Sequence, residues 1–253
     1  MNIYIALLKR EFILFTKNII PNLLLYSVFP IFLFLFLMVP LNKIIDTNTG
    51  MSYLYHGMPS IIFVSSTMIA FIVPLLIIKR DRYDSENLKF IFTISTNNII
   101  YSLYILTFAI LTSYIQFSVS LFFSMRLAES IILGLDRALF FFVAIFPSML
   151  LFATFGLLLS NFIKKNESII ICIFFLFIIL AFGIGSFIPI DYFSEKYYKL
   201  TYAWNLIFHL YNIFIKIFEG ENIGFGVPII AILISIFFYF INTIFFLKTL
   251  RKY

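Results

Sequence analysis

Apolar residues fill six stretches of this chain that contain no Asp, Glu, Lys or Arg. Each stretch supplies the roughly 20 apolar residues with which a helix crosses about 30 Å of hydrocarbon. We therefore predict an all-α membrane protein that forms one domain over residues 1–253. Six transmembrane helices are expected at about 21–41, 58–78, 99–123, 138–163, 169–190 and 226–247.

A seventh apolar stretch, residues 200–215, is too short to cross a bilayer. As a helix it would rise about 24 Å, and Asn205 and His209 interrupt it. We predict an outer re-entrant or surface-lying helical hairpin over residues 191–222, with a break at Asn205 where freed backbone groups need polar partners. The residues assigned to this hairpin are Pro189, Trp204, Asn205, His209 and Gly220.

Residues 1–17 are predicted to form a helix that lies along the membrane surface. Apolar residues recur there at helical spacing, while the polar residues gather elsewhere on the helical wheel. No small-residue cleavage site follows the first apolar stretch, so no cleavable signal peptide is expected. A frayed basic leader is the alternative interpretation. The charged residues assigned to the interfacial helix are Lys9, Arg10 and Glu11.

Composition supports a membrane protein and indicates its orientation. Hydrophobic residues make up 62% of the chain and charged residues 12%, whereas soluble domains carry about 25% charge. Twelve of the 18 basic residues fall in the terminal segments and alternate loops that would lie on one side. This bias predicts that both termini are cytoplasmic. The net charge of +6 lies in loops, so we read it as an orientation signal and expect no nucleic-acid partner.

Sequence motifs for catalysis, cofactors and metals are absent. The chain has no GxxxxGK[ST] phosphate-binding loop and no HExxH zinc motif. His56 and His209 are far apart in sequence; they are either interfacial polar residues or, if they meet on the outer face, a metal contact. The single Cys172 permits no disulfide within the chain. The spans carry no ionisable relay of the kind that proton-driven pumps use. Sodium coupling through hydroxyls and carbonyls stays open; otherwise the energy for any uphill transport is expected from a partner.

Polar side chains form a stripe along the third predicted span. One interpretation is hydrogen bonding between helices, and the other is a wettable wall of a transport path. Both stay open at this point. The candidate path-lining residues are Tyr104, Thr107, Thr112, Tyr114, Gln116 and Ser120.

The most polar cytoplasmic stretch is residues 79–98. Its first half alternates in charge, and its second half places apolar residues on one helical face. This pattern suits a short coupling helix that docks into a soluble protein, although a solvated loop would show a similar pattern. The candidate coupling residues are Arg80, Asp81, Arg82, Asp84, Glu86, Leu88, Lys89, Ile91 and Phe92.

The order of these parts resembles the permease subunits of ABC-2 type exporters. The segment LLKREFILFTKN at residues 7–18 is similar to the family's opening helix through Arg10 and Glu11. Residues 81–95 resemble the start of its coupling helix, although Glu86 and Asn87 replace Gly and Thr, and Ser95 stands where Pro is usual.

Residues 185–220 resemble the family's outer segment. Pro189, Asn205 and Gly220 fit the pattern, whereas Leu206 replaces Pro and Lys216 stands near the usual Arg. The likeness covers nearly the whole chain in architecture through motifs that are individually degenerate.

The resemblance implies a permease subunit of an ATP-driven exporter in the bacterial cytoplasmic membrane. Its cargo would be amphipathic: a drug, a peptide, a lipid or a lipid-linked glycan. ATP and Mg²⁺ would bind a separate ABC ATP-binding subunit, so this chain would not be an enzyme. The permease would pair with a second copy or a paralogue and contact membrane lipid. Two other classes remain open: a non-transporting immunity or assembly protein, and a membrane-embedded lipid-modifying enzyme.

Overall fold

The computed structural model describes residues 3–45, 53–83, 98–127, 135–163, 165–219 and 224–250. Every regular element in these residues is helical, which confirms the predicted all-α class. Six helical stretches are long and apolar enough to cross a membrane, as the hydrophobic pattern predicted.

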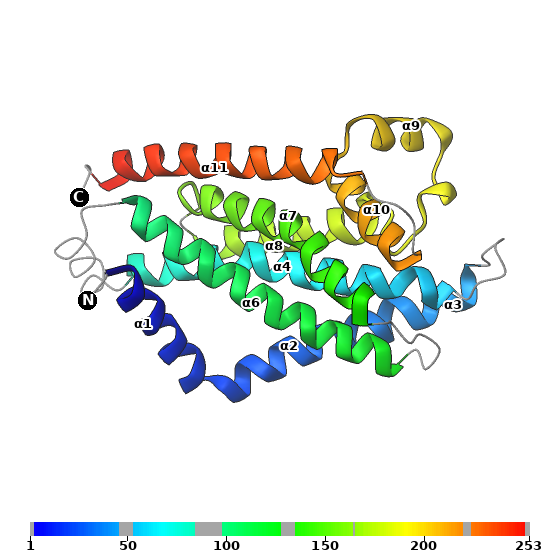
Figure 1. Ribbon diagram of the computed structural model, residues 1–253, viewed down its shortest axis with the longest axis horizontal. Helices are drawn as coiled ribbons and strands as arrows, with labels where there is room; N and C mark the ends of the chain where they lie inside the picture. Colours follow the sequence, from blue (N-terminus) through cyan, green and yellow to red (C-terminus); the bar gives the residue numbers. More distant parts are fainter. Residues whose placement is uncertain are drawn as a thin grey trace.

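The spans form an up-and-down bundle (Figure 1). A first helix, α1 (Ile3–Lys17), precedes a continuous first span built from α2 (Ile19–Leu33), the π-helical turn η1 (Phe34–Met38) and α3 (Val39–Ile44). The other spans are α4 (Tyr53–Tyr83), α6 (Asn98–Leu127), α7 (Leu135–Ser160), α8 (Asn166–Ile178) with the π-helical turn η2 (Ile179–Gly183), and α11 (Gly226–Leu250). Between η2 and α11 lie the short 3-10 turn η3 (Ile190–Tyr192), α9 (Glu195–Trp204) and α10 (Leu206–Glu219).

The fifth span is shorter than the sequence suggested. Its helix ends at Gly183 rather than continuing to residue 190. Gly185 has φ +76°, a left-handed conformation that glycine adopts without the steric cost of a Cβ. The chain therefore leaves the helix here and passes through an irregular segment before η3.

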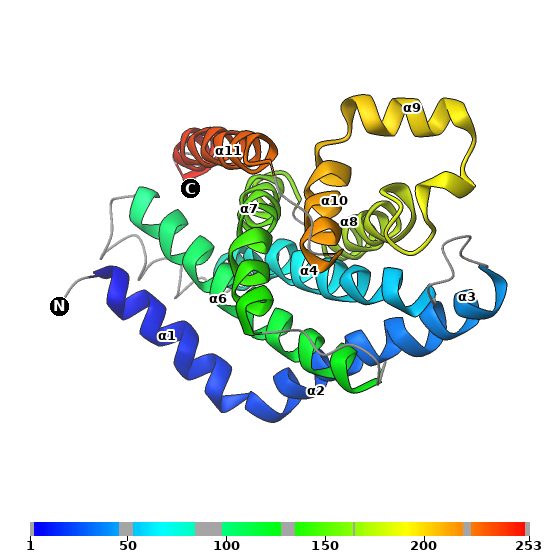
Figure 2. The same ribbon diagram turned by 45° about the vertical axis from the view of Figure 1, so that its right-hand side comes forward.

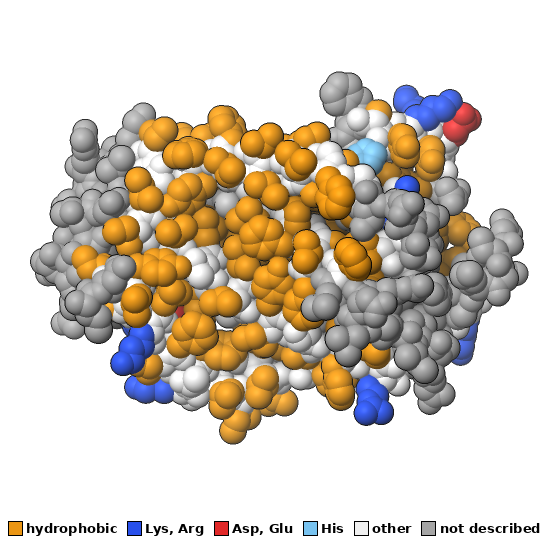
Figure 3. Space-filling model, viewed as in Figure 1, with side chains coloured by type: hydrophobic (Ala, Val, Ile, Leu, Met, Phe, Trp, Pro, Cys, Tyr) orange, Lys and Arg blue, Asp and Glu red, His pale blue; other side chains and the backbone are white. Residues whose placement is uncertain are grey.

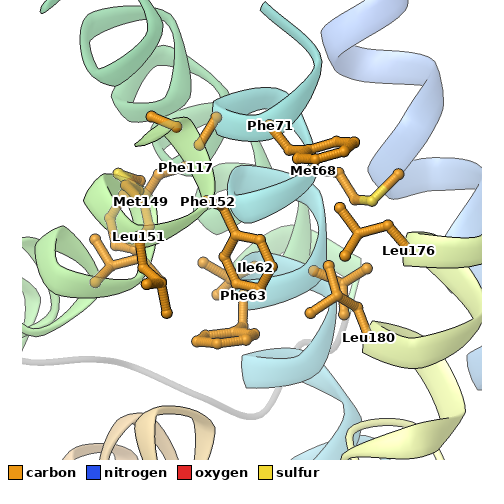
Figure 4. Packing of buried hydrophobic residues seen from close by; sticks show 14 of the residues in the cluster. Ile62, Phe63, Met68, Phe71, Phe117, Met149, Leu151, Phe152, Leu176 and Leu180 are labelled. Carbon is orange, nitrogen blue, oxygen red and sulfur yellow. The ribbon is translucent and has the colours of Figure 1, made fainter. Parts of the chain in front are cut away.

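Helix α4 lies at the centre of the bundle, with 83% of its spanning window buried. Figure 4 shows its Ile62, Phe63, Met68 and Phe71 surrounded by apolar side chains of α6, α7 and α8. Lipid tails are as apolar as the side chains, so helices in a membrane associate through close packing rather than through the hydrophobic effect. Gly156 of α7 allows that approach, because a Cβ there would lie 2.4 Å from the Phe71 carbonyl oxygen.

Helices α8 and α11 lie at the periphery, with only 22% and 17% of their spanning windows buried. Their outward side chains are large and apolar, as lipid contact requires. In Figure 3 hydrophobic side chains cover the middle of the molecule, while the visible lysines and arginines lie towards its two ends. This distribution matches a protein that crosses a bilayer along its longest axis.

Candidate functional site

The two ends of the bundle differ in which segments meet there. At one end, which we call the α1 end, lie the start of α1, the end of α4, the start of α6 and the end of α11 (Figures 1 and 2). Helix α9 stands off from the bundle at the opposite end, the α9 end. Among the described residues, the ion pairs that join distant parts of the chain lie at the α1 end, while polar contacts between helices occur at both ends and along α6.

Four ionised side chains form a cluster at the α1 end. Helix α1 supplies Arg10 and Glu11, and the last turns of α4 supply Arg80 and Asp81. Arg80 binds both carboxylate oxygens of Glu11, with Nη1–Oε2 at 3.0 Å and Nη2–Oε1 at 2.6 Å. Arg10 Nη2 lies 2.8 Å from Glu11 Oε1 and 3.0 Å from Asp81 Oδ2. We refer to these four residues as the ion cluster.

Two tyrosines of α6 form hydrogen bonds with Asp81. The hydroxyls of Tyr101 and Tyr104 donate to Asp81 Oδ2 at 3.0 and 3.2 Å. Helix α1 is joined to α6 again where the Tyr4 hydroxyl donates to Thr107 Oγ1 at 2.8 Å. The cluster therefore binds α1, α4 and α6 to one another.

The carboxylates of the ion cluster are buried, while its two arginine side chains are partly exposed. The Glu11 and Asp81 side chains are 3% and 1% exposed, against 23% for Arg10 and 38% for Arg80. Burial alone would lower the pKa of Arg10, but Tyr104, Asp81 and Glu11 outweigh it and raise that pKa above its ordinary value. The two cations match the two anions, which is the condition under which buried charge is tolerated.

Helices α7 and α11 are joined to the same end. Arg82 Nη1 donates to the carbonyl oxygen of Ser160, the last residue of α7, at 2.6 Å, a favourable cation at a helix C-terminus. From α11, the Asn242 amide donates to Ser102 Oγ at 3.1 Å and accepts from Asn161 Nδ2 at 2.5 Å. The helix ends on either side of residues 84–97 are thus held by side chains of α1 and α11 and by the last backbone carbonyl of α7.

The predicted coupling residues fall into two groups. Arg80, Asp81 and Arg82 lie in the last turn of α4 and make the contacts given above. Asp81, a candidate for contact with a soluble partner, is instead fully buried and pairs with groups of this chain. The remaining candidates lie outside the described residues: Asp84, Glu86, Leu88, Lys89, Ile91 and Phe92.

The candidate path-lining residues are all hydrogen-bonded in this structure, chiefly between helices. Beside Tyr104 and Thr107, the Tyr114 hydroxyl donates to the Phe142 carbonyl of α7 at 2.9 Å. Thr112 donates to carbonyls of its own helix. Gln116 donates to the Tyr26 carbonyl of α2 and to Ser120, and Ser120 lies 2.7 Å from Ser65 Oγ of α4. The geometry favours helix–helix bonding over a wettable wall in the conformation described.

At the α9 end the helix breaks at Asn205. The Asn205 side chain accepts from the backbone N–H groups of Ile207 and Phe208, both at 3.1 Å, and so caps the start of α10. His209 Nε2 lies 2.7 Å from the Tyr202 carbonyl oxygen. Trp204 ends α9 and Pro189 precedes η3, whereas Gly220 lies outside the described residues. That α9 and α10 enter the outer leaflet of the membrane stays a prediction.

The irregular segment after η2 is held by hydroxyl groups. The Ser60 hydroxyl of α4 donates to the Ser186 carbonyl at 2.5 Å, and the Tyr211 hydroxyl of α10 lies 3.2 Å from the same oxygen. Tyr53 donates to the Phe187 carbonyl, and Tyr197 donates to the Gly183 carbonyl at 2.8 Å. We call this arrangement the hydroxyl cluster. It satisfies carbonyls that a continuous helix would have bonded itself.

Sequence reasoning singled out the four residues of the ion cluster but not their pairing, and it missed the polar residues that the hydroxyl cluster and α11 supply. Adjacent opposite charges occur at Arg10–Glu11 and Arg80–Asp81, just before the first span and at the end of the second. That repeated pairing was a signal that the two sites could bind each other. No signal pointed to Asn161 or Asn242. Among the described residues no group of three His, Cys, Asp or Glu is placed to hold a metal ion.

These features define a multi-pass helical membrane protein with an ion cluster at the end of the bundle where its second span ends and its third span begins. A comparison with protein families matches residues 3–218 to the ABC-2 type transporter family. The chain belongs to that family and is the membrane component of an ABC transporter, as its opening, coupling and outer motifs suggested. The family implies an ABC ATP-binding subunit as partner. Comparisons with curated proteins and with solved structures gave no match.

Proposed function

We propose that this chain is the permease subunit of an ATP-driven exporter of an amphipathic cargo, and that the ion cluster transmits movement from the coupling segment to the spans. The observation that carries the proposal is the linkage of Asp81 to α1 and α6. Asp81 lies in the last turn of α4 and its tyrosine partners lie in the first turns of α6. A force on residues 84–97 therefore acts on two helix ends that are already bound to α1.

The energy for transport would enter from a separate ABC ATP-binding subunit that carries ATP and Mg²⁺. Two copies of the permease, or one copy and a paralogue, would form the path in the bacterial cytoplasmic membrane. The α1 end would be cytoplasmic, as the bias in basic residues indicates. Drugs, peptides, lipids and lipid-linked glycans are the cargo classes that suit a path bordered by lipid.

Orientation is tested by cysteine labelling from outside the cell in a Cys172→Ser background. Single cysteines at Glu195 and Leu200 should react with a membrane-impermeant maleimide, since both side chains are exposed at the α9 end. Cysteines at Ser85 and Lys252 should react only after the membrane is opened. Reaction of either of the last two in intact cells would overturn the orientation.

The coupling role is tested with the permease and its ATP-binding subunit in vesicles. Leu200→Cys serves as the reporter, and ATP should change its labelling rate in the otherwise unaltered complex. Asp81→Asn should abolish that change while the two subunits still purify together, because the carboxylate that links α4 to α1 and α6 has lost its charge. Glu195→Gln, which removes a charge from an exposed pair at the α9 end, is the matched control and should keep the response.

Two results would contradict this proposal. If a folded Asp81→Asn complex still showed the normal ATP-dependent change in labelling rate, the ion cluster would not transmit movement from the coupling segment. An unchanged labelling rate after inactivation of the ATPase, together with preserved biological activity, would instead favour a non-transporting immunity protein.

A further inference from the structure

The first span has lost one of its own backbone hydrogen bonds. Pro30 lies four residues after Tyr26, and proline has no N–H to donate to the carbonyl one turn earlier. Within the hydrocarbon an unpaired carbonyl costs several kcal/mol unless a neighbouring group bonds it. Another part of the molecule should therefore supply a donor to the Tyr26 carbonyl.

Gln116 of α6 is that donor. Its Nε2 lies 3.1 Å from the Tyr26 carbonyl oxygen and 2.9 Å from Ser120 Oγ. Since both neighbours can accept, the amide nitrogen must face them. Ser120 is in turn 2.7 Å from Ser65 Oγ of α4. One fully buried side chain thus connects α2 to α6 and α4.

The first span exposes most of its surface. Only 29% of its spanning window is buried, against 50% for the third span and 83% for the second. A second fixed point lies further along the span, where Met38 fills the notch at Gly57; a Cβ on Gly57 would lie 1.8 Å from Met38 Sδ. Pro30 lies between these two points, and the π-helical turn η1 ends at the second of them, Met38.

Tyr26 also touches α1. Its ring stacks on Phe15, with the ring centroids 6.0 Å apart and the planes inclined by 24°. The residue whose carbonyl Gln116 holds is therefore also a residue through which α1 contacts α2. Helix α1 carries Arg10 and Glu11 of the ion cluster.

We infer that Gln116 is a positioning residue for the first span: it replaces the hydrogen bond that Pro30 removes and fixes α2 against α6 where α1 contacts it. A side-chain bond of this kind can break and re-form without unwinding α2. The acceptor Oε1 of the same amide is buried with no partner among the described residues. In this conformation the side chain therefore acts through its donor, Nε2.

The inference predicts that Gln116 matters only while residue 30 is proline. Gln116→Met removes the donor at similar length, and Pro30→Ala returns a backbone N–H to α2. Spin labels on Leu24→Cys and Phe122→Cys, both at exposed positions, report the distance between α2 and α6 in a Cys172→Ser background. The distances are measured by double electron–electron resonance in nanodiscs.

Gln116→Met should broaden the distribution of distances between residues 24 and 122 and lower the melting temperature by about 2–4 °C. Combining it with Pro30→Ala should restore the narrow distribution and the melting temperature. Ser118→Ala is the matched control, because within the described part of the chain the Ser118 hydroxyl bonds only the Tyr114 carbonyl of its own helix. It should change neither quantity.

An unaltered distribution in Gln116→Met, or a double variant as broad as Gln116→Met, would overturn the inference. If Gln116→Met fails to fold, recovery of folded protein in the double variant supports the inference and its failure contradicts it. No ATP-binding subunit is used, so the result is independent of the coupling role proposed above.

Discussion

The α1 end and the α9 end solve a similar problem with different chemistry. At the α1 end, ionised groups from α1 and α4 pair with one another, and two tyrosines complete the ion cluster. At the α9 end, a broken helix leaves carbonyl groups that neutral hydroxyls from α4, α9 and α10 satisfy. Charged pairs lose much when one partner is removed, whereas interhelical hydrogen bonds in membranes average only about 0.6 kcal/mol.

This difference suggests a division of roles. The α1 end is joined by contacts that are costly to break singly, so its helices are expected to move together. The α9 end is joined by several weak contacts that can be exchanged one at a time. A permease that receives force at one end and opens at the other would need both kinds of contact.

The largest effect is expected at Asp81. Asp81→Leu leaves Arg10 and Arg80 with a single carboxylate, and it should reduce the free energy of unfolding by about 3–5 kcal/mol. Adding Arg10→Met removes one charge of each sign, so the double variant should be more stable than Asp81→Leu alone. The free energies of unfolding of the single and the double variant are measured in mixed detergent micelles. Equal loss in the two variants would show that charge balance does not govern this end.

The backbone turn at the α9 end comes next. Gly185→Ala should cost about 1–2 kcal/mol, because a residue with a Cβ resists positive φ. That Cβ would also lie 3.2 Å from the Ile190 Cβ. Gly224→Ala is the control, since nothing lies within 4 Å of a Cβ there. In the same unfolding assay Gly185→Ala should be less stable than Gly224→Ala. Equal stability of the two variants would show that the turn at Gly185 does not stabilise this end.

Single hydroxyls of the hydroxyl cluster should matter less. Tyr211→Phe and Ser60→Ala should each cost about 0.6 kcal/mol. Each breaks the 2.6 Å hydrogen bond between the two hydroxyls but leaves the Ser186 carbonyl with the other hydroxyl nearby. The double variant removes both hydroxyls from the Ser186 carbonyl, and an unsatisfied buried carbonyl costs about 1–3 kcal/mol. A loss greater than the sum of the singles is therefore expected. Strict additivity would mean that the two hydroxyls do not share this acceptor.

Local patterns in the sequence were enough to predict the spans but not the contacts between them. Charge-free stretches of spanning length locate six apolar helices, because lipid imposes that length and composition on any helix. Asn205 was expected at the break because a broken helix needs polar side chains. By contrast, the Arg10–Asp81 contact joins residues 71 positions apart, and a charged loop residue looks the same in sequence whether it meets water or a partner. Gly185 likewise gives no sign in sequence of the φ that it adopts.

The smallest effect is expected at the charged pair of the α9 end. Glu195 and Lys199 are 2.6 Å apart, yet their side chains are 81% and 73% exposed. Water and salt screen such pairs, so Glu195→Gln should change the free energy of unfolding by no more than about 0.5 kcal/mol. Raising the ionic strength should shrink even that change, while the cost of Asp81→Leu should persist because its carboxylate is buried. Comparable losses at Glu195 and Asp81 would show that burial does not distinguish the two ends, and the contrast between them would have to be abandoned.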